Sequence, residues 1–296
     1  MGLDINAVHF LISAHKRGVR FGEVLMIGRQ DLNVYPAKMV QVLKRANLAC
    51  ETFEVGGKDT QYSEPFFRAL GAGNVCSLDA SDFEGAQIVH DLNKPIGDEF
   101  KQRFDVVYDG GTLEHIFNFP IALRNCMELV KLGGRLFIHA PANNWCGHGF
   151  YQFSPELFYR ALSPQNGFEV ERMIVHPVGP YGRWHEVVDP DQIGSRVEAL
   201  TFYPLHVLIQ AKRSSAIPIF ASAPQQSDYA PRWVDATLAT GTMEKPAVFP
   251  PPARPWLSKV APGLARLVHV LRMGLDLYRR ESIFWNRKAF RRVKKQ

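Results

Sequence analysis

The sequence predicts an α/β fold built on a doubly wound, mostly parallel sheet, and two observations lead to this prediction. Between about residues 20 and 213, short apolar runs typical of buried strands alternate with stretches whose apolar residues recur at helical spacing. The chain has 296 residues, of which 46% are hydrophobic. This suits one α/β domain of about 200 residues with an additional segment.

The N-terminal elements are expected to be a helix, a strand and two more helices. Apolar residues follow helical spacing over residues 4–17, with Asp4 as the N-cap. Glu23–Gly28 is an apolar run that ends in glycine, which is typical of a buried strand. Pro36 begins a helical pattern, because proline is favoured in the first turn of a helix. Residues 63–70 predict a further short helix.

Six more strands are expected along the rest of this region. They are Asn74–Asp79, Ala86–His90, Phe104–Tyr108, Arg135–Ala140, Phe168–His176 and Pro204–Lys212. A helix over Ile121–Val130 is expected to stop at Lys131–Gly134, because glycine is favoured just after a helix, and Ser154 opens another helix. No helical pattern separates the last two strands. We therefore expect them to form a pair at one edge of the sheet, antiparallel to the rest.

Composition argues against several kinds of site. The four cysteines lie far apart without CxxC spacing, so neither a disulfide framework nor a metal site is expected. The N-terminus lacks the basic and apolar stretches of a secretory signal, and no run of about 18 apolar residues is present. We expect a cytoplasmic protein without a membrane-spanning helix.

Positive charge is concentrated at the C-terminus. Residues 257–296 contain eleven Lys and Arg and two acidic residues, a net charge of +9, whereas residues 1–256 sum to −3. Apolar residues from Val260 to Tyr278 keep helical spacing, which predicts a basic amphipathic helix with a frayed aromatic and basic end. Residues 214–256 contain eight prolines and predict a linker, or an arm that lies on the domain.

The basic tail is expected to bind an anionic membrane surface, which would place the protein at the inner face of a membrane. Nucleic acid is less favoured as a partner, because Phe284, Trp285 and Phe290 cluster near the end of the tail. The same pattern is also compatible with binding in a groove of a partner protein, or with docking of the apolar stripe onto the chain's own domain. Nothing in the sequence indicates an oligomeric state.

The expected strand ends carry residues suited to an adenosyl ligand. Ligands of open α/β sheets bind at the carboxyl ends of the strands. Gly28 lets the backbone pass close to a bound group, and the carboxylate of Asp79, followed by Ala80, suits two ribose hydroxyls. Asp91 suits the adenine amino group, with the backbone at Leu92 beside the ring.

The fourth strand is followed by a recognisable pattern. FDVVYDGGTLEHIFN (Phe104–Asn118), with KLGGRLFIHAPAN and FSPELF further on, resembles class I S-adenosylmethionine-dependent methyltransferases that carry a Leu-Glu-His motif after the fourth strand. The resemblance covers about residues 20–213, and Leu113-Glu114-His115 is its most specific part. It implies a Rossmann-like, seven-stranded methyltransferase sheet, S-adenosylmethionine as cofactor, and methyl transfer by in-line displacement.

The resemblance also implies roles for individual positions. Gly28 marks the first cofactor loop, Asp79 is the ribose acid and Asp91 is the adenine contact. The segment Asp109–Thr112 lies beside the sulfonium, where Gly110 leaves room for the methionine part.

The first cofactor loop departs from the family pattern, because it holds the single glycine Gly28 where Gly-x-Gly is usual. In the favoured interpretation, Arg29 and Gln30 replace bare backbone contacts, and the Arg29 guanidinium clamps the methionine carboxylate. In the other, the loop no longer binds cofactor and the domain is a relic scaffold. A dehydrogenase is disfavoured, because GxGxxG is absent and its acid would have to be Glu51 or Glu54.

The loop Pro141–Phe153 is expected to overhang the methyl-transfer site. His148 is the candidate general base for a hydroxyl acceptor, since histidine titrates near neutrality. The alternative role for His148 is to hold backbone groups of the loop. Asn144 and Tyr151 are candidate acceptor contacts. His115 is expected to support the site structurally.

A second loop, Gly179–Glu186, contributes Arg183 and Trp184 as candidate contacts to a sugar or an acidic substrate. Packing against the proline-rich arm is their alternative role. His139 lies within an expected strand and is assigned to the core.

Together these observations divide the chain into an N-terminal helix (1–19), a methyltransferase domain (20–213), a proline-rich linker or arm (214–256) and a basic helical tail (257–296). The expected function is methyl transfer from S-adenosylmethionine to a small-molecule or glycan acceptor, at oxygen. The alternative is a catalytically inactive binding or scaffold protein that its tail localises.

Overall fold

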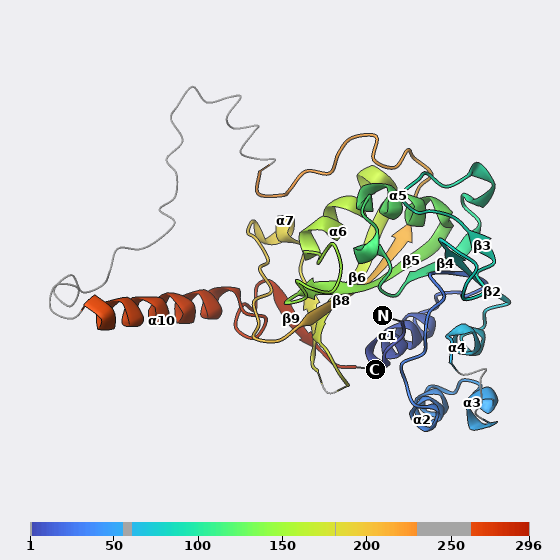
Figure 1. Ribbon diagram of the computed structural model, residues 1–296, viewed down its shortest axis with the longest axis horizontal. Helices are drawn as coiled ribbons and strands as arrows, with labels where there is room; N and C mark the ends of the chain where they lie inside the picture. The colour runs from blue at the N-terminus through green and yellow to red at the C-terminus, as the bar shows by residue number, and fades with distance from the viewer. Residues whose placement is uncertain (1, 56–60, 181, 230–261, 296) are drawn as a thin grey trace.

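The computed structural model describes residues 2–55, 61–180, 182–229 and 262–295. Its named strands form one sheet in the order β3-β2-β1-β4-β5-β8-β6-β7-β9 (Figure 1). The strands are β1 (Glu23–Ile27), β2 (Asn74–Asp79), β3 (Ile88–Val89), β4 (Phe104–Asp109), β5 (Val130–Asn143), β6 (Phe168–Pro177), β7 (Trp184–Val187), β8 (Leu205–Arg213) and β9 (Phe290–Val293). The helices are α1 (Ile5–Lys16), α2 (Pro36–Ala46), α3 (Glu51–Val55), α4 (Glu64–Ala69), α5 (Phe119–Leu129), α6 (Pro155–Ala161), α7 (Pro190–Ile193) and α10 (Pro262–Glu281).

The sheet is doubly wound and mostly parallel, as predicted, but it has nine strands where seven are expected. Strands β1 to β5 pair in parallel, and β8 lies antiparallel between β5 and β6. Strand β6 therefore runs parallel to the first five, so the prediction that the last two strands are both antiparallel is wrong. The two strands do pair antiparallel with each other, as predicted, but they do not lie at the edge, because β7 and β9 continue the sheet beyond β6.

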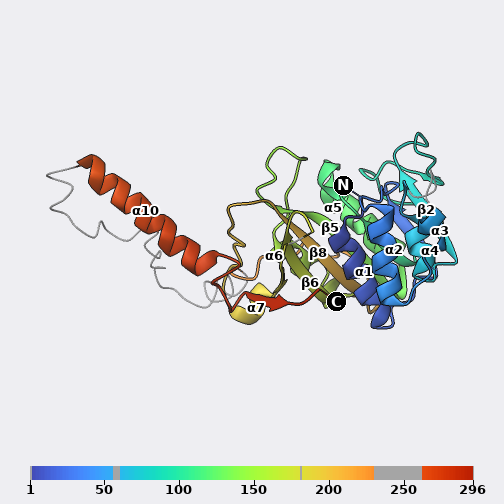
Figure 2. The same cartoon turned by 90° about the horizontal axis from the view of Figure 1, so that it is seen from below.

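Each face of the sheet is covered by its own helices. Helices α1, α2 and α4 pack their apolar residues with Met26, Tyr108 and Phe137 on one face (Figure 2). Helices α5 and α6 pack on the other face, against residues such as Ile27 and Leu136. The alternation of side chains along each strand separates these two apolar clusters.

Local signals place most helix boundaries. Asp4 caps α1 by accepting hydrogen bonds from the backbone N–H groups of Asn6 and Ala7, and Ser154 caps α6 through Leu157. The helix expected over Ile121–Val130 ends within one residue of the predicted position, but Lys131–Gly134 lie in β5 and do not form the expected stop. Helix α5 ends at Leu129 and the chain enters β5 directly, with an irregularity in the β4–β5 pairing that accommodates the glycines.

The end of the tail is ordered into the sheet. The predicted frayed end instead forms β9, which pairs antiparallel with β7 from Trp184 opposite Val293 to Val187 opposite Phe290. The loop expected at Gly179–Glu186 includes most of β7. An edge strand exposes unpaired backbone groups. Strand β9, which lies about a hundred residues after β7 in the sequence, pairs with those of β7.

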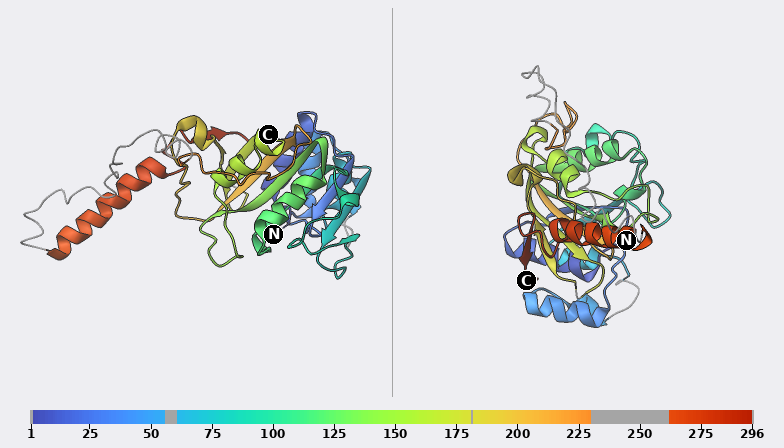
Figure 3. Two further views of the ribbon diagram at one scale, coloured as in Figure 1. Left: turned by 90° about the horizontal axis from the view of Figure 1, so that it is seen from above. Right: turned by 90° about the vertical axis from the view of Figure 1, so that its left-hand side faces the viewer.

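Helix α10 projects away from the sheet (Figures 1 and 3). Its exposed apolar side chains include Leu264, Leu267, Val268, Leu271 and Leu275. Within the described residues, a helix with both the length and the apolar character to cross a membrane is absent.

The described part of the proline-rich segment, residues 214–229, lies on the domain. Ile219 is buried in the core cluster that contains α6, and Ser227 donates hydrogen bonds to the Glu156 carboxylate. The remainder of the predicted linker, with Pro250–Pro252, and residues 257–261 of the predicted tail lie outside the described residues.

Candidate active site

The carboxyl ends of β1, β2 and β4 are level with one another. Ile27 lies opposite both Leu78 and Asp109 in the parallel register, and the N–H of Gly28 donates to the carbonyl of Leu78. Strands β2 and β3 lie on one side of β1, and β4 and β5 lie on the other, so the strand order reverses direction at β1. The carboxyl end of the sheet at such a point is the expected ligand site of the fold.

Gly28 provides a cradle at this point that any side chain would fill. Its φ of 71° lies in the left-handed region. A Cβ added there would lie 2.8 Å from Thr112 Oγ1 and 3.9 Å from Asp79 Oδ2. The first loop, the second strand and the fourth strand therefore converge on the bare Cα of Gly28.

The two acids expected to contact the adenosine, Asp79 and Asp91, differ in the hydrogen bonds that they already accept within the protein. Asp79 Oδ1 accepts from the N–H of Ala80, while Oδ2 faces Gly28. Asp91 Oδ1 accepts from the backbone and side chain of Asn93, and these hydrogen bonds, with the nearby Lys94, lower the Asp91 pKa. Leu92 is buried in the core. Asp79 and Gly28 thus fit an adenosyl group, whereas Asp91 also serves as a turn residue.

Arg29 is already paired within the protein. Its Nε donates to Glu64 Oε1 at 2.7 Å, its Nη1 donates to the carbonyl of Glu84, and its guanidinium lies 3.9 Å from the Tyr62 ring centroid. In this conformation the group is held on the α4 side of the loop. The predicted clamp on a methionine carboxylate would require Arg29 to leave these partners.

Gln30 fills the space beside the fourth strand. It is 4% exposed, and its Nε2 donates to the carbonyls of Ile27 and Gly28. Its Oε1 occupies the position that a Cβ on Gly110 would take, so Gly110 leaves room for Gln30. The Gly110 carbonyl in turn accepts from the N–H of Gly2 at 2.8 Å.

Two buried carboxyl groups, Asp109 at the end of β4 and Glu114 in the turn after it, lie near each other. Asp109 Oδ1 accepts from the N–H groups of Thr112 and Leu113, which ties β4 to the short 3-10 turn at Leu113–His115. Asp109 Oδ2 and both carboxylate oxygens of Glu114 are buried without a hydrogen-bond partner among the described residues. Burial raises the pKa of Asp109 to about 7 and that of Glu114 to about 8, the nearby Asp109 adding to the latter.

His148 lies against Glu114. Its Nε2 is 3.6 Å from Glu114 Oε1, and Glu114 is wholly buried whereas the His148 side chain is 28% exposed. The loop is fixed there because the carbonyl of Glu114 accepts from the N–H groups of Phe150 and Tyr151. Burial lowers the pKa of His148. Sequence reasoning named His148 but gave Glu114 no chemical role.

The other predicted loop contacts are engaged in holding the loop. Asn144 donates from Nδ2 to the carbonyls of Thr201 and Tyr203. The Tyr151 hydroxyl donates to the carbonyl of Phe117 at 2.7 Å. His115 lies beside the pair, with its ring centroid 5.2 Å from that of His148.

Trp184 is buried in the core, which does not fit its predicted role as a substrate contact. Its side chain is 1% exposed, and its indole N–H donates to Asn6 Oδ1 on α1. The alternation along β7 turns Trp184 into the core, whereas Arg183 just before the strand is exposed.

The structure also disfavours the dehydrogenase alternative, because Glu51 and Glu54 lie in α3 and the acid at the end of β2 is Asp79.

Comparisons with known proteins give structural neighbours only. No family model and no curated protein matches the sequence. The 1,6-didemethyltoxoflavin-N1-methyltransferase of Burkholderia thailandensis, solved with S-adenosylhomocysteine, is 16% identical, with 71% of this chain and 80% of that chain covered and a TM-score of 0.36. The YcgJ protein of Bacillus subtilis is 12% identical, with coverages of 71% and 98% and a TM-score of 0.39.

A third neighbour is the branched-chain polyamine synthase of Thermus thermophilus, solved with 5'-methylthioadenosine. It is 13% identical, with 76% of this chain and 61% of that chain covered and a TM-score of 0.36. At such scores these similarities do not bear on function, which has to be argued from the site itself.

Proposed function

We propose that this chain is an S-adenosylmethionine-dependent methyltransferase that acts at an oxygen of a small-molecule or glycan acceptor. The observation that carries the proposal is the convergence of Gly28, Asp79 and Asp109 at the carboxyl ends of adjacent strands, beside the Glu114–His148 pair. An adenosyl site and an acid–base pair next to each other are what methyl transfer to a hydroxyl requires.

S-Adenosylmethionine supplies an electrophilic methyl group when it is bound. Asp79 would hold the ribose hydroxyls, Asp91 would accept from the adenine amino group, and the open Cα of Gly28 would let the ligand approach the backbone closely. Arg29 and Gln30 would contact the methionine part only after leaving their present partners. We therefore expect the loop to rearrange on binding.

His148 is the proposed general base. Ionised Glu114 would accept from the Nε2–H of His148 and so fix the tautomer that leaves Nδ1 free to take the acceptor's proton. The raised pKa of Glu114 means that the pair must lose a proton near pH 8 to reach this form. The reaction should accordingly be faster at mildly alkaline pH.

Two exposed aromatic rings near the Glu114–His148 pair support an acceptor with an apolar ring face. Phe117 and Phe150 are 73% and 66% exposed and meet edge to face, with ring centroids 5.8 Å apart. The carbonyl of Phe117 accepts from the Tyr151 hydroxyl, and the N–H of Phe150 donates to the carbonyl of Glu114. Exposed aromatic pairs beside polar groups suit a sugar or another cyclic acceptor.

Calorimetry with S-adenosylmethionine and S-adenosylhomocysteine tests the proposal. We expect both to bind the full chain and Asp79→Ala to abolish detectable binding, because the ribose hydroxyls lose their acceptor. Asp98→Ala, which removes an exposed carboxylate paired with Lys101, is the matched control and should bind normally. Absence of binding to the unsubstituted chain would refute the enzymatic proposal.

That refuting outcome would instead favour a catalytically inactive binding or scaffold protein. One observation favours this second candidate: Gln30 and Gly2 both lie against Gly110, where the resemblance implies the methionine part. A chain that retains this closed loop would show neither binding heat nor thermal stabilisation with either nucleoside.

We also propose that α10 attaches the protein to an anionic membrane surface at the cytoplasmic face. Leu267 and Leu271 are 55% and 56% exposed on the projecting helix, and the exposed Arg272 and Arg279 accompany them. Apolar and basic side chains on one exposed helix suit the headgroup region of such a membrane.

A further inference from the structure

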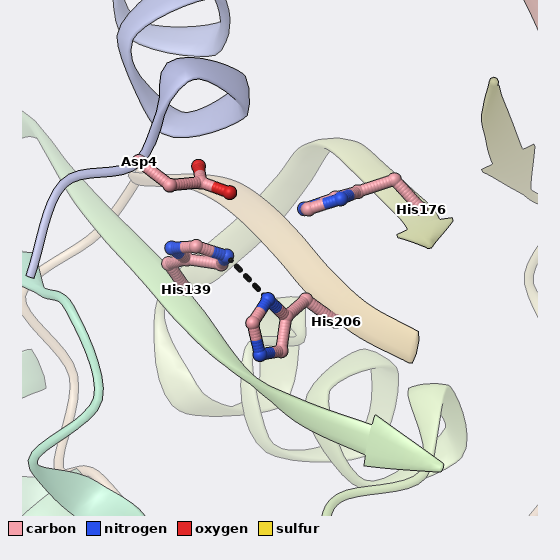
Figure 4. Close-up of side chains that lie close together, drawn as sticks. All are labelled: Asp4, His139, His176 and His206. Carbon is pink, nitrogen blue, oxygen red and sulfur yellow. Dashed lines mark hydrogen bonds between the residues drawn. The ribbon is translucent and has the colours of Figure 1, made fainter. Parts of the chain in front are cut away.

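Three histidines from three adjacent strands meet on the α1 face of the sheet (Figure 4). His139 lies on β5, His206 on β8 and His176 on β6. His176 lies directly opposite His206 in the register, and His139 lies opposite Leu208, two residues further along β8. The two-residue period of strands therefore turns all three imidazoles to the same face.

Asp4 approaches the same point from the segment before α1 (Figure 4). Each of the four residues offers one ligand atom, and these atoms lie within 4.8 Å of one another. His139 Nε2 and His206 Nδ1 are only 3.2 Å apart. The Asp4 carboxylate accepts three hydrogen bonds from Asn6 and Ala7 as the helix cap. Because a carboxylate has about four lone-pair sites, it can still bind an ion.

The imidazoles are buried and keep unused nitrogens, with His139, His176 and His206 1%, 0% and 6% exposed. The Lys295 ammonium, which donates to the carbonyl of Pro180, is near enough to lower the pKa of His176. His176 Nδ1 is 2.8 Å from the carbonyl of Pro177 and donates to it, which leaves the lone pair of Nε2 directed away. His176 Nε2 is buried without a hydrogen-bond partner among the described residues, a costly state unless a ligand occupies it.

The protonation states suit a cation. Burial lowers the pKa of all three histidines, to about 4 for His176 and about 2 for His206, so they are neutral. Burial opposes ionisation of Asp4, but His139, His176 and the cap hydrogen bonds lower its pKa to about 2. Neutral imidazoles and an ionised carboxylate are the forms that bind metal.

We propose that Asp4, His139, His176 and His206 bind one divalent transition-metal ion, with Zn²⁺ the best match. Nitrogen and oxygen donors in a four-ligand set suit Zn²⁺. Bonds of about 2.0–2.1 Å in a tetrahedron place the ligand atoms about 3.3 Å apart. The His139–His206 pair already has this separation, and small side-chain rotations bring the other two atoms inward.

The site is closed, because four protein ligands complete a tetrahedron and the histidines are buried. Its role is therefore structural. It would join Asp4 to β5, β8 and β6. The N–H groups of the adjacent Gly2 and Leu3 donate to the carbonyls of Gly110, just after β4, and Asp31, in the loop after β1. The ion would therefore fix the N-terminal segment over the candidate cofactor loop.

Trp145 separates this site from the proposed base. Its ring stacks on His206 with centroids 4.8 Å apart and meets His148 edge-on at 5.0 Å. Glu114, His115 and His148 also lie within 4.8 Å of one another, but they offer three ligand atoms and His115 is exposed. We assign Glu114 and His148 to acid–base chemistry and His115 to their support.

The test is metal binding by the full chain after treatment with a chelator. We expect one Co²⁺ per chain with the intense visible absorption of a tetrahedral site, displacement by Zn²⁺, and a higher thermal unfolding midpoint with Zn²⁺. Asp4→Asn is the decisive variant, because asparagine caps a helix as well as aspartate does but is a poorer metal ligand. Asp4→Asn and His176→Gln should each weaken Zn²⁺ binding by about 10-fold or more.

His269→Gln on α10 is the matched control, and it should bind Zn²⁺ as the unsubstituted chain does. Circular dichroism of each metal-free variant separates loss of a ligand from loss of the fold. Absence of Co²⁺ or Zn²⁺ binding, or unchanged affinity in Asp4→Asn, would overturn the proposal. If His148→Gln lost the ion while Asp4→Asn and His176→Gln both retained it, the ion would bind at the Glu114–His115–His148 cluster. That result would also overturn the proposal.

Discussion

Glu114 is the residue whose burial has the clearest energetic consequence. It is fully buried and both of its carboxylate oxygens are without a hydrogen-bond partner among the described residues. Because its pKa is raised from 4.5 to about 8 on folding, the folded chain binds this proton more tightly than the unfolded chain. The Glu114 contribution to stability is thus greatest at low pH and is lost as pH rises from about 4.5 to about 8.

Glu114→Gln should remove this loss. We expect the variant to match the wild type near pH 5 and to exceed its free energy of unfolding by about 3–5 kcal/mol above pH 8, since each pKa unit is worth about 1.4 kcal/mol. Urea unfolding across this pH range measures the difference. Glu84→Gln, which removes an exposed carboxylate, should follow the wild-type curve. Parallel curves for Glu114→Gln and the wild type would contradict the assigned burial of the charge.

At the scale of single residues, sequence patterns located the strand-end residues but not the partners of their side chains. Gly28 and Asp79 could be placed because local strand patterns set where β1 and β2 end. The pairing of Arg29 with Glu64 spans 35 positions, and no short-range pattern encodes it. The Glu114–His148 contact is likewise made by a loop that returns over the turn after β4.

At the scale of elements, the pairing of β9 with β7 is the least expected contact. Phe290 is 4% exposed and belongs to the core cluster that also contains Val187, its partner across the strands. Phe284, in the same segment, is 42% exposed. A four-residue strand was not recognisable in the tail, because basic residues surround its apolar positions and the edge that receives it forms only in the folded sheet.

Phe290→Ala should therefore destabilise the domain. Truncation of a buried phenylalanine costs about 3–5 kcal/mol, and we expect a loss of this order in chemical denaturation. Phe284→Ala is the matched control, and a loss of about 1 kcal/mol or less is expected because its ring is partly exposed. Equal, small losses in both variants would mean that β9 does not dock on β7.

At the scale of the whole molecule, the positive charge of the tail is shared between the projecting α10 and the segment that docks on the sheet. Residues 262–281 carry four Arg and two acids, a net charge of +2, whereas residues 282–296 carry six Lys and Arg without an acid. An anionic surface would therefore attract both α10 and the β9 edge of the sheet. This geometry leaves the carboxyl ends of the strands unobstructed by the helix (Figure 3).

Flotation with vesicles tests this arrangement. We expect the full chain to float with phosphatidylserine-containing vesicles at low salt, to float less as salt rises, and to stay unbound with neutral vesicles. The double variant Leu267→Ser and Leu271→Ser should lose binding, because it removes apolar contact and keeps every charge. Val89→Ser, which alters an apolar residue exposed on β3, is the control. Binding that persists in the double variant would refute insertion through this helix.

The sequence by itself determined the parallel α/β core and the strand-end acids. Each of these depends on residues close together in the chain, where periodicity and capping act directly. Only the tertiary structure decided that β8 enters between β5 and β6, that β9 completes the sheet, and that Asp4 meets His139, His176 and His206. Those contacts join segments tens to hundreds of residues apart, because strand order is settled when whole surfaces pack and not by the local preferences of any one strand.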